Sequence, residues 1–285
     1  MNKKEPYFIG IGVPKSGSTW FMRILKTHPK IFTTERKEPH FFSNDEFFKS
    51  GLDNYLKLYK NINENQVAGE FSTKYLRKAE KVSPRIKKIF PNTKLICILR
   101  NPVERSNSHF NWLKQLGKID KTLSIKEAIK INKGIVNFSK YSNGLKIFLK
   151  DFSKDNILIL KTEDLKNKPA EVFSDVINFL NIDHYKFNFE ETSKSETIIP
   201  KFILLEKIRT YSHQKIRDFN QDWIFNTQVA NIFSKFYRKF NSNPKKNLKL
   251  NLSEKRYLAN IFKEDLSELQ NITDLDLSDW GEYPK

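Results

Sequence analysis

The fold is decided by the stretch Tyr7–Leu25, which reads YFIGIGVPKSGSTWFMRIL. Its first seven residues form a continuous apolar run that predicts a buried strand, and residues 19–25 follow a helix-like pattern. Between them lies a loop that contains Gly12 and Gly17. A glycine-rich turn between a strand and a helix directs backbone N–H groups and a helix N-terminus at one point. The stretch therefore predicts a site that holds a phosphate.

This loop differs from the loop that binds nucleoside triphosphates. In the motif G-x-x-x-x-G-K-[ST], the lysine after the second glycine reaches the outer phosphates and the next hydroxyl holds magnesium. Gly12 and Gly17 have that spacing, but Ser18 stands in the place of the lysine. The loop carries Lys15 next to Pro14 instead, where its ammonium is expected nearer a bridging oxygen than a terminal phosphate. The pattern predicts a positive charge directed at a leaving group.

A second anion site is predicted where the apolar run Lys94–Leu99 ends in Arg100. A nucleoside triphosphatase would usually offer an acidic residue to magnesium at this point. An arginine would repel a metal, but it can bind a phosphate through two parallel hydrogen bonds. Residues 101–105 open a helix that presents Ser108 on the same side two turns later. Together the two motifs predict a nucleotide with phosphates at its 5′ and 3′ positions and no metal between them, whereas either motif alone is weak.

The rest of the first two thirds of the chain predicts more strands and crossover helices. Residues 156–160 form another apolar run, and a shorter one at 67–69 ends at Glu70. A serine and a proline at 83–84 are typical of a helix start, and residues 168–180 have apolar side chains at helical spacing. Continuous apolar strands alternating with helices indicate a parallel sheet that is covered on both faces. We expect an α/β, P-loop-like three-layer sandwich.

The strand patterns end after about Glu191, and residues 191–285 are predicted to be a helix- and loop-rich acceptor and lid region. Its last helix is an amphipathic run from Ser253 to Leu269. Within it, residues 195–201 are a candidate for closing over the nucleotide, and residues 202–240 are a candidate acceptor gate. The chain has 285 residues, 38% of them hydrophobic, and shows no repeat or linker composition. Residues 1–285 are therefore predicted to form a single domain.

Charge and cysteine content limit the function classes. The net charge of +18 suits nucleic acid, an anionic membrane surface or an acidic substrate, although lysine is spread along the whole chain and a genome-wide compositional bias explains it equally well. No stretch approaches the roughly 20 apolar residues of a membrane span, and no signal-peptide pattern is present. The single cysteine, Cys97, lies in an apolar run and excludes an internal disulfide. We expect a cytoplasmic protein.

At this point the two motifs resemble those of the sulfotransferases that use 3′-phosphoadenosine 5′-phosphosulfate (PAPS). Residues 13–20, VPKSGSTW, resemble the 5′-phosphosulfate loop of that family, and residues 100–108, RNPVERSNS, resemble its 3′-phosphate segment. Five further segments are similar, in the same order, to the heparan sulfate and carbohydrate branch: KEPHFF at 37–42, GEFS at 69–72, YSNG at 141–144, EDL at 163–165 and LDLSDW at 275–280. The resemblance covers nearly the full chain.

The resemblance implies roles for individual residues. Lys15 would stabilise the departing 5′-phosphate, and Glu70 matches the glutamate that serves as general base, with His40 as a reserve base. The donor would be held by Pro14, Lys15, Ser16, Gly17, Ser18, Thr19, Trp20, Arg100 and Ser108. The chain departs from the carbohydrate branch at Phe71, where that branch usually has a lysine, and in lacking the cysteines for its disulfide.

The predicted reaction is metal-independent in-line transfer of a sulfuryl group from PAPS to a hydroxyl or amine, which yields adenosine 3′,5′-bisphosphate (PAP). The acceptor would be a carbohydrate or a small, for example phenolic, molecule, and a positioned carboxylate would accelerate the loss of its proton by about 10²- to 10⁴-fold. One alternative is a P-loop small-molecule kinase, which Ser18 argues against. The other is a basic nucleic-acid-binding protein, although we expect no nucleic-acid partner. The acceptor and the oligomeric state stay open.

Overall fold

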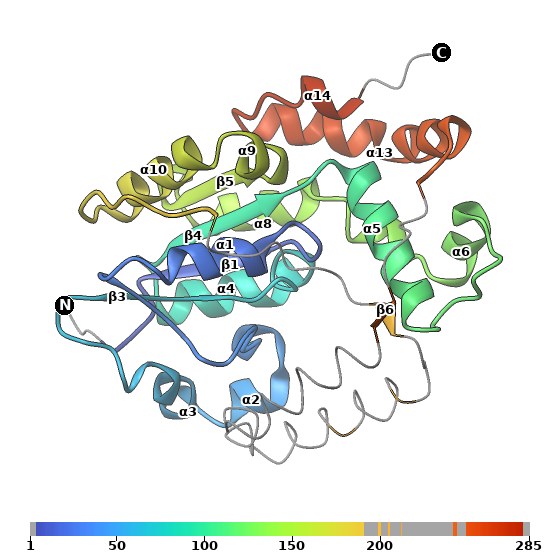
Figure 1. Cartoon of the computed structure of the whole chain (residues 1–285). Coiled ribbons are helices and arrows are strands. Elements are labelled where there is room, and N and C mark those ends of the chain that lie inside the picture. The colour runs from blue at the N-terminus through green and yellow to red at the C-terminus, as the bar shows by residue number, and fades with distance from the viewer. Residues whose placement is uncertain are drawn as a thin grey trace.

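Five parallel strands form the central sheet in the order β2-β3-β1-β4-β5 (Figure 1). The computed structural model describes residues 4–190 and 249–281, together with residues 199–200, 205, 212 and 242–243. The strands are β1 (Phe8–Gly12), β2 (Ile31–Thr33), β3 (Val67–Phe71), β4 (Lys94–Leu99) and β5 (Ile157–Lys161). The predicted parallel sheet is confirmed.

Helices cover both faces of the sheet, as its apolar strands require. On one face, Phe8, Ile96 and Leu160 pack against α1 (Ser18–Leu25), α9 (Thr162–Asn167) and α10 (Pro169–Leu180). On the other face, Ile9 and Leu95 pack against α4 (Ala79–Ile89) and α8 (Ser142–Asp151). The three layers confirm the α/β sandwich, and they leave the carboxyl ends of the strands as the accessible edge.

A third hydrophobic cluster joins the C-terminal helix to the middle of the chain. It contains residues of α5 (Pro102–Gln115), α6 (Ile125–Ile131), α7 (Gly134–Asn137) and α13 (Leu252–Ile272). The short last helix, α14 (Ser278–Gly281), buries Trp280 in the core of the sandwich. The remaining short helices are α2 (Asp45–Lys49), α3 (Leu52–Leu56) and the 3₁₀ turns η1 (Phe41–Ser43), η2 (Lys57–Tyr59), η3 (Leu76–Lys78) and η4 (Lys154–Asn156).

Glycine and phenylalanine alternate across β1 and β3. Phe8 pairs with Gly69, and Gly10 pairs with Phe71. A Cβ atom on Gly10 would lie 1.9 Å from Cδ2 of Phe71, and one on Gly69 would lie 2.1 Å from Cζ of Phe8. Each ring therefore occupies the space that the opposite glycine leaves, and the two strands pack closely together next to the loop that follows β1.

Several local predictions need correction. β3 continues through Phe71, so Glu70 lies inside the strand rather than after it, and β2 carried no signal that we recognised. α4 begins at Ala79, and Pro84 lies inside it, where the carbonyl of the exposed Glu80 loses its helical partner.

The C-terminal third is described only in part. The predicted run 253–269 is confirmed as part of α13. Two short strands, β6 (Ile199–Pro200) and β7 (Ser242–Asn243), pair antiparallel, although no strand was predicted after Glu191. Most of the residues of the predicted nucleotide-closing segment and acceptor gate, 195–240, lie outside the described residues.

The single cysteine is buried, as predicted. Cys97 lies fully buried in β4, where burial raises the pKa of its thiol far above the ordinary value, so it behaves as an apolar side chain. Within residues 4–190 and 249–281, no helix has both the length and the apolar character that a bilayer crossing requires.

Candidate functional site

A cavity of about 560 Å³ opens at the carboxyl ends of β1, β3 and β4. It is lined by the loop after β1, by Thr73 and Lys74 after β3, and by Arg100 after β4. Residues of α5 and of the segment 137–141 close its far side. Ligands of open α/β sheets bind at this edge of the strands, so the cavity lies where the fold favours a site.

The loop between β1 and α1 is shaped for an anion. Lys15 and Gly17 have left-handed φ angles of 74° and 86°, and Gly17 is the N-cap of α1. The buried hydroxyl of Ser16 donates a 2.6 Å hydrogen bond to the carbonyl of Val13. Thr162 on α9 donates to the carbonyls of Ser16 and Leu99, at 2.8 Å each. The loop is thus fixed from both sides, and the first N–H groups of α1 have no acceptor within the helix.

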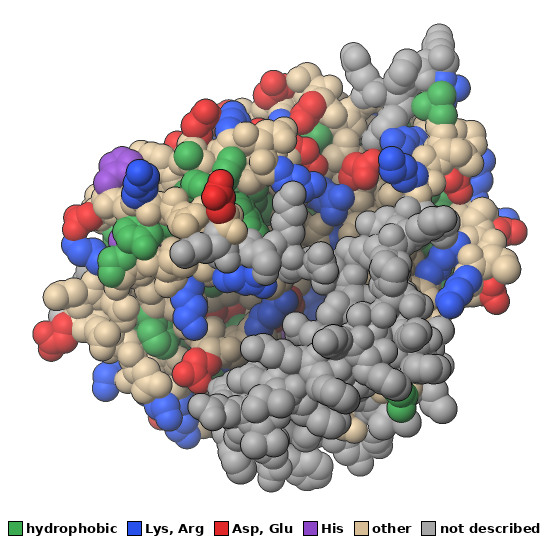
Figure 2. Space-filling view, viewed as in Figure 1, with side chains coloured by type: hydrophobic (Ala, Val, Ile, Leu, Met, Phe, Trp, Pro, Cys, Tyr) green, Lys and Arg blue, Asp and Glu red, His purple; other side chains and the backbone are tan. Residues whose placement is uncertain are grey.

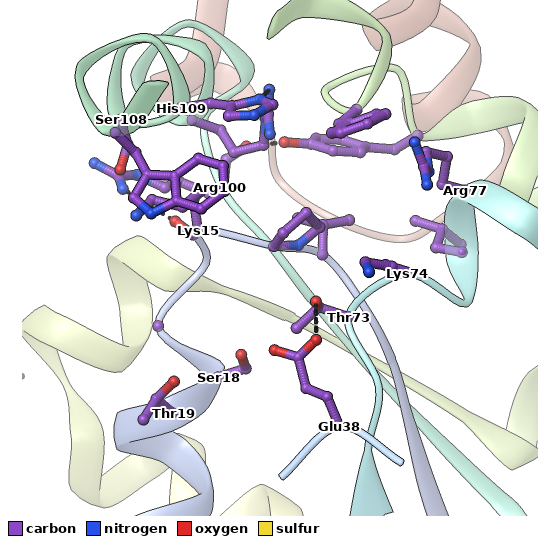
Figure 3. A pocket seen from close by; sticks show the side chains of 18 of the residues that line it. Lys15, Ser18, Thr19, Glu38, Thr73, Lys74, Arg77, Arg100, Ser108 and His109 are labelled. Carbon is purple, nitrogen blue, oxygen red and sulfur yellow. Dashed lines mark hydrogen bonds between the residues drawn. The ribbon is translucent and has the colours of Figure 1, made fainter. Parts of the chain in front are cut away.

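Arg100 connects this loop to the second predicted anion site. Its Nη1 atom donates a 3.0 Å hydrogen bond to the main-chain oxygen of Lys15. Its buried Nε atom has no partner among the described residues. The carbonyl of Arg100 accepts a 2.8 Å bond from the hydroxyl of the buried Tyr141, and Ser108 of α5 lines the same cavity. Figure 3 shows Lys15, Arg100 and Ser108 gathered on one side of the pocket.

α5 is positioned by its N-cap. The side chain of Asn101 accepts hydrogen bonds from the N–H groups of Val103 and Glu104 at 3.0 and 3.2 Å. The helix then carries Ser108 and His109 to the cavity. The predicted helix after Arg100, and its presentation of Ser108, are confirmed.

Two further residues of α5 were not predicted as site residues. Arg105 is fully buried, and Nε donates to the hydroxyl of Ser139. Burial, followed by the charges of Arg105 and Lys15, lowers the pKa of His109 to about 3. Because His109 is therefore neutral at ordinary pH, it adds no positive charge to the cavity.

Glu38 is the carboxylate at the cavity. Its Oε2 atom accepts a 2.9 Å bond from the hydroxyl of Thr73 and lies 3.2 Å from Nε2 of His40. Burial, the largest influence, acts to raise its pKa, but the hydrogen bond and charge of His40 and the bond from Thr73 outweigh it, and the pKa is lowered. Figure 3 shows Glu38 between Ser18 and Thr73. Glu38 is therefore an ionised acceptor at the cavity.

Glu70 occupies a different environment. It is fully buried and does not line the cavity. Its carboxyl accepts hydrogen bonds of 2.8 Å from Ser72 and from Tyr75. Burial is the main cause that raises its pKa to about 7. Because β3 runs on through Phe71, the alternation of the strand directs Glu70 into the core, and the residues that reach the cavity come after the strand.

Most of the predicted donor residues meet at the cavity. Those that line it are Pro14, Lys15, Gly17, Ser18, Thr19, Arg100 and Ser108. Four predicted residues do not line it: Ser16, Trp20, Glu70 and His40. Ser16 bonds within the loop, and Trp20 packs on Phe173 with ring centroids 5.9 Å apart. The segment KEPHFF at 37–42 resembles the family, but that resemblance assigns no role to its glutamate, Glu38.

Basic side chains form the wall of the cavity across from the loop between β1 and α1, residues 13–17, which we call the donor loop. Lys74, Arg77 and Lys140 are exposed and line it, and Lys37 lies beside Glu38. Arg77 lies over the ring of Phe138, with its guanidinium carbon 4.1 Å from the ring centroid. Figure 2 shows Lys and Arg side chains at the hollow in the middle of this face. This wall favours a negatively charged ligand in the half of the cavity that the donor loop does not use.

The sheet, the glycine-containing loop after β1 and the arginine after β4 define an α/β protein in which the two predicted anion sites are linked by a hydrogen bond. Residues 5–269 match the family model described as "Sulfotransferase domain". The chain belongs to this family, and the resemblance seen in its motifs is confirmed. Membership of the sulfotransferase domain family does not favour the two alternatives, a P-loop small-molecule kinase and a basic nucleic-acid-binding protein.

Individual relatives cover parts of the chain. Membrane-associated sulfotransferase kil1 of Dictyostelium discoideum is 36% identical over 117 residues, which are 39% of this chain and 24% of that protein. Heparan sulfate glucosamine 3-O-sulfotransferase 6 of Homo sapiens is 28% identical over 201 residues, 65% of this chain and 57% of that protein. The chain thus spans 24% and 57% of the lengths of these two relatives.

Solved structures share the fold over almost the whole chain. A sulfotransferase from Alicyclobacillus acidocaldarius has a TM-score of 0.67 at 19% identity and is matched over 98% of this chain and 99% of that one. Retinol dehydratase in complex with androsterone and the inactive cofactor PAP has a TM-score of 0.50 at 13% identity, over 96% and 84% of the two chains. These likenesses agree with the P-loop-like α/β fold.

Proposed function

We propose that this protein transfers a sulfuryl group from PAPS to a hydroxyl or amine of an acceptor and releases PAP. The observation that carries the proposal is the hydrogen bond between Arg100 and the main chain of Lys15, which brings the residues proposed to bind the two phosphates to one cavity. A nucleotide with 5′ and 3′ phosphates uses both positions. Membership of the sulfotransferase domain family supports this choice of donor.

The residues at the cavity fit such a nucleotide. The start of α1, with Ser18 and Thr19, offers N–H groups and hydroxyls to a 5′-phosphate. Arg100 has a buried Nε atom without a partner among the described residues, and Ser108 lies at the same cavity, so the pair is suited to the 3′-phosphate. Lys15 would meet the charge that develops on the departing phosphate.

We assign the role of general base to Glu38 in place of Glu70. The base must reach the acceptor's proton, directly or through one water, and Glu38 lines the cavity while Glu70 is fully buried away from it. The lowered pKa of Glu38 keeps it ionised and ready to accept a proton at neutral pH. Its hydrogen bond from Thr73 fixes one oxygen, which leaves the other carboxylate oxygen to face the acceptor.

The basic wall favours an anionic carbohydrate as the acceptor. Lys74, Arg77 and Lys140 are exposed at the cavity and would bind carboxylate or sulfate groups of an acidic saccharide. Relatives named as heparan sulfate glucosamine 3-O-sulfotransferases support this class. A small phenol is the second candidate, because Trp112 and Phe138 also line the cavity.

The test is a transfer assay with ³⁵S-labelled PAPS over acidic polysaccharides, neutral oligosaccharides and simple phenols. We expect label in an acidic saccharide and a fall of about 10²- to 10⁴-fold with Glu38→Gln. Glu64→Gln, on an exposed residue remote from the cavity, is the matched control. Absence of transfer to every acceptor, together with absence of PAP binding, would contradict the proposed function. Transfer that survives Glu38→Gln would contradict the choice of base.

A further inference from the structure

The buried cluster around Glu70 supports the backbone turn that carries Glu38. Glu38 and His40 both have left-handed backbone conformations, with φ angles of 54° and 60°. Such angles are uncommon for residues other than glycine, and they persist where neighbouring groups hold the chain in place. The 3₁₀ turn η1, with His40 as its N-cap, begins immediately afterwards.

Two hydroxyls after β3 hold this turn by its main chain. The N–H of His40 donates a 3.0 Å hydrogen bond to Oγ of Ser72, and the N–H of Phe42 donates a 3.4 Å bond to the hydroxyl of Tyr75. A hydroxyl accepts a bond in a defined direction only when its own hydrogen points elsewhere. Both hydrogens point at Glu70, because Ser72 and Tyr75 each donate to it at 2.8 Å.

From this geometry we infer that Glu70 is a positioning residue, which acts through Ser72 and Tyr75 to hold Glu38 at the cavity. The inference rests on the proposed function, in which Glu38 is the base. The same short segment also supplies Thr73, whose hydroxyl donates to Glu38 directly. A glutamine at position 70 would replace one acceptor oxygen with an NH₂ donor, so at least one hydroxyl would have to turn its hydrogen away.

Other contacts would keep the turn folded against α4 and the segment before it when Glu70 is changed, although its position could shift. Lys78 donates a 3.0 Å bond to the carbonyl of Ser43, and Arg85 donates a 3.0 Å bond to the carbonyl of Phe42. These bonds do not involve Glu70. The expected effect of Glu70→Gln is therefore a shift in the turn and not a loss of the fold.

A double-mutant cycle tests the inference with the acceptor that the wild-type protein sulfates, at about pH 8, where the carboxyl of Glu70 is ionised because its pKa is about 7. We expect Glu70→Gln and Ser72→Ala each to lower kcat by about tenfold, and the double variant to lose about tenfold and not a hundredfold. The KM for PAPS and the Kd for PAP should stay at the wild-type values, because the donor loop is untouched. The control is Ser83→Ala, which removes the 2.6 Å hydrogen bond that the buried Ser83 of α4 donates to Asp151 at the end of α8.

Hydrogen–deuterium exchange gives a second measurement that needs no acceptor. We expect the amides of His40 and Phe42 to exchange at least about tenfold faster in Glu70→Gln than in wild type or Ser83→Ala. Additive losses of kcat, an equal loss of PAP affinity, or unchanged exchange at both amides would overturn the inference. A wild-type protein that transfers no sulfate would overturn the proposed function instead, and the exchange result would still decide whether Glu70 holds the turn.

Discussion

Nη1 of Arg100 donates a 3.0 Å hydrogen bond to the main-chain oxygen of Lys15, and this contact joins the end of β4 to the loop after β1. Two elements that are 85 residues apart in the sequence thereby form one site. The contact uses one nitrogen of the guanidinium, while Nε has no partner among the described residues. Arg100 is therefore positioned by the loop and still able to bind an anion.

The first prediction concerns the 3′-phosphate. Arg100→Ala should weaken PAP binding by about 10- to 100-fold, because hydrogen bonds to charged groups contribute about 1.5–3 kcal/mol. Binding of adenosine 5′-monophosphate, which lacks the 3′-phosphate, should weaken much less. Isothermal titration with both nucleotides measures the difference. Equal losses for the two nucleotides would mean that Arg100 acts only through the loop and not on the 3′-phosphate.

The second prediction separates the binding and the chemistry of the donor loop. Lys15→Ala should lower kcat by about 10²- to 10³-fold, because the ammonium is proposed to stabilise charge that develops only as the phosphate departs. The Kd for PAP should change far less than kcat. Lys15→Arg keeps the charge and should recover part of the rate. A loss of affinity as large as the loss of kcat would assign Lys15 to ground-state binding.

The donor half of the site could be predicted from sequence because its signals are local. Gly12, Gly17 and Lys15 lie within one loop, and Arg100 follows directly on a continuous apolar run. These spacings determine backbone conformation and the direction of a helix N-terminus, so the sheet and most of the residues that line one end of the cavity could be predicted before the fold was known.

The carboxylate that we propose as the base could not be predicted in the same way. Whether Glu38 or Glu70 reaches the cavity depends on where β3 ends, and strand ends are poorly determined by sequence patterns. A strand that ended at Gly69 would have released Glu70 to the site, but the strand continues for two more residues. The left-handed turn at Glu38 depends on tertiary contacts from Ser72 and Tyr75, for which no local pattern exists.

The third prediction concerns stability and pH. Burial raises the pKa of Glu70 from 4.5 to about 7, and the groups that face it include Glu38, Tyr55 and Tyr75. Between these two pH values the folded protein binds more protons than the unfolded chain, so this residue's stabilising contribution is present below about pH 4.5 and is lost as the pH rises through 7. Glu70→Gln does not titrate and should lack this loss.

Urea unfolding of both proteins at about pH 5 and pH 8 measures the effect. The free energy of unfolding of the wild type, relative to Glu70→Gln, should fall on the order of 2–3 kcal/mol between the two conditions, since each unit of pKa difference corresponds to about 1.4 kcal/mol. Titrating groups that do not interact with Glu70 cancel in this difference. A constant difference would show that Glu70 titrates at its ordinary pKa in the folded protein.

The last prediction concerns the packing of Phe71 against Gly10 of the neighbouring strand. Its ring fills the space above Gly10 on the neighbouring strand, so that a Cβ at Gly10 would lie 1.9 Å from Cδ2 and 2.2 Å from Cγ of Phe71. Gly10→Ala should destabilise the protein by about 1–3 kcal/mol through overpacking, whereas Gly281→Ala, with no atom within 4 Å of the added Cβ, is the neutral control.

Phe71→Ala alone should cost about 3–5 kcal/mol because it leaves a cavity. The double variant Gly10→Ala/Phe71→Ala should cost less than the sum of the two in urea unfolding, because each change relieves the defect of the other. Additive costs would show that the ring and the glycine do not depend on each other.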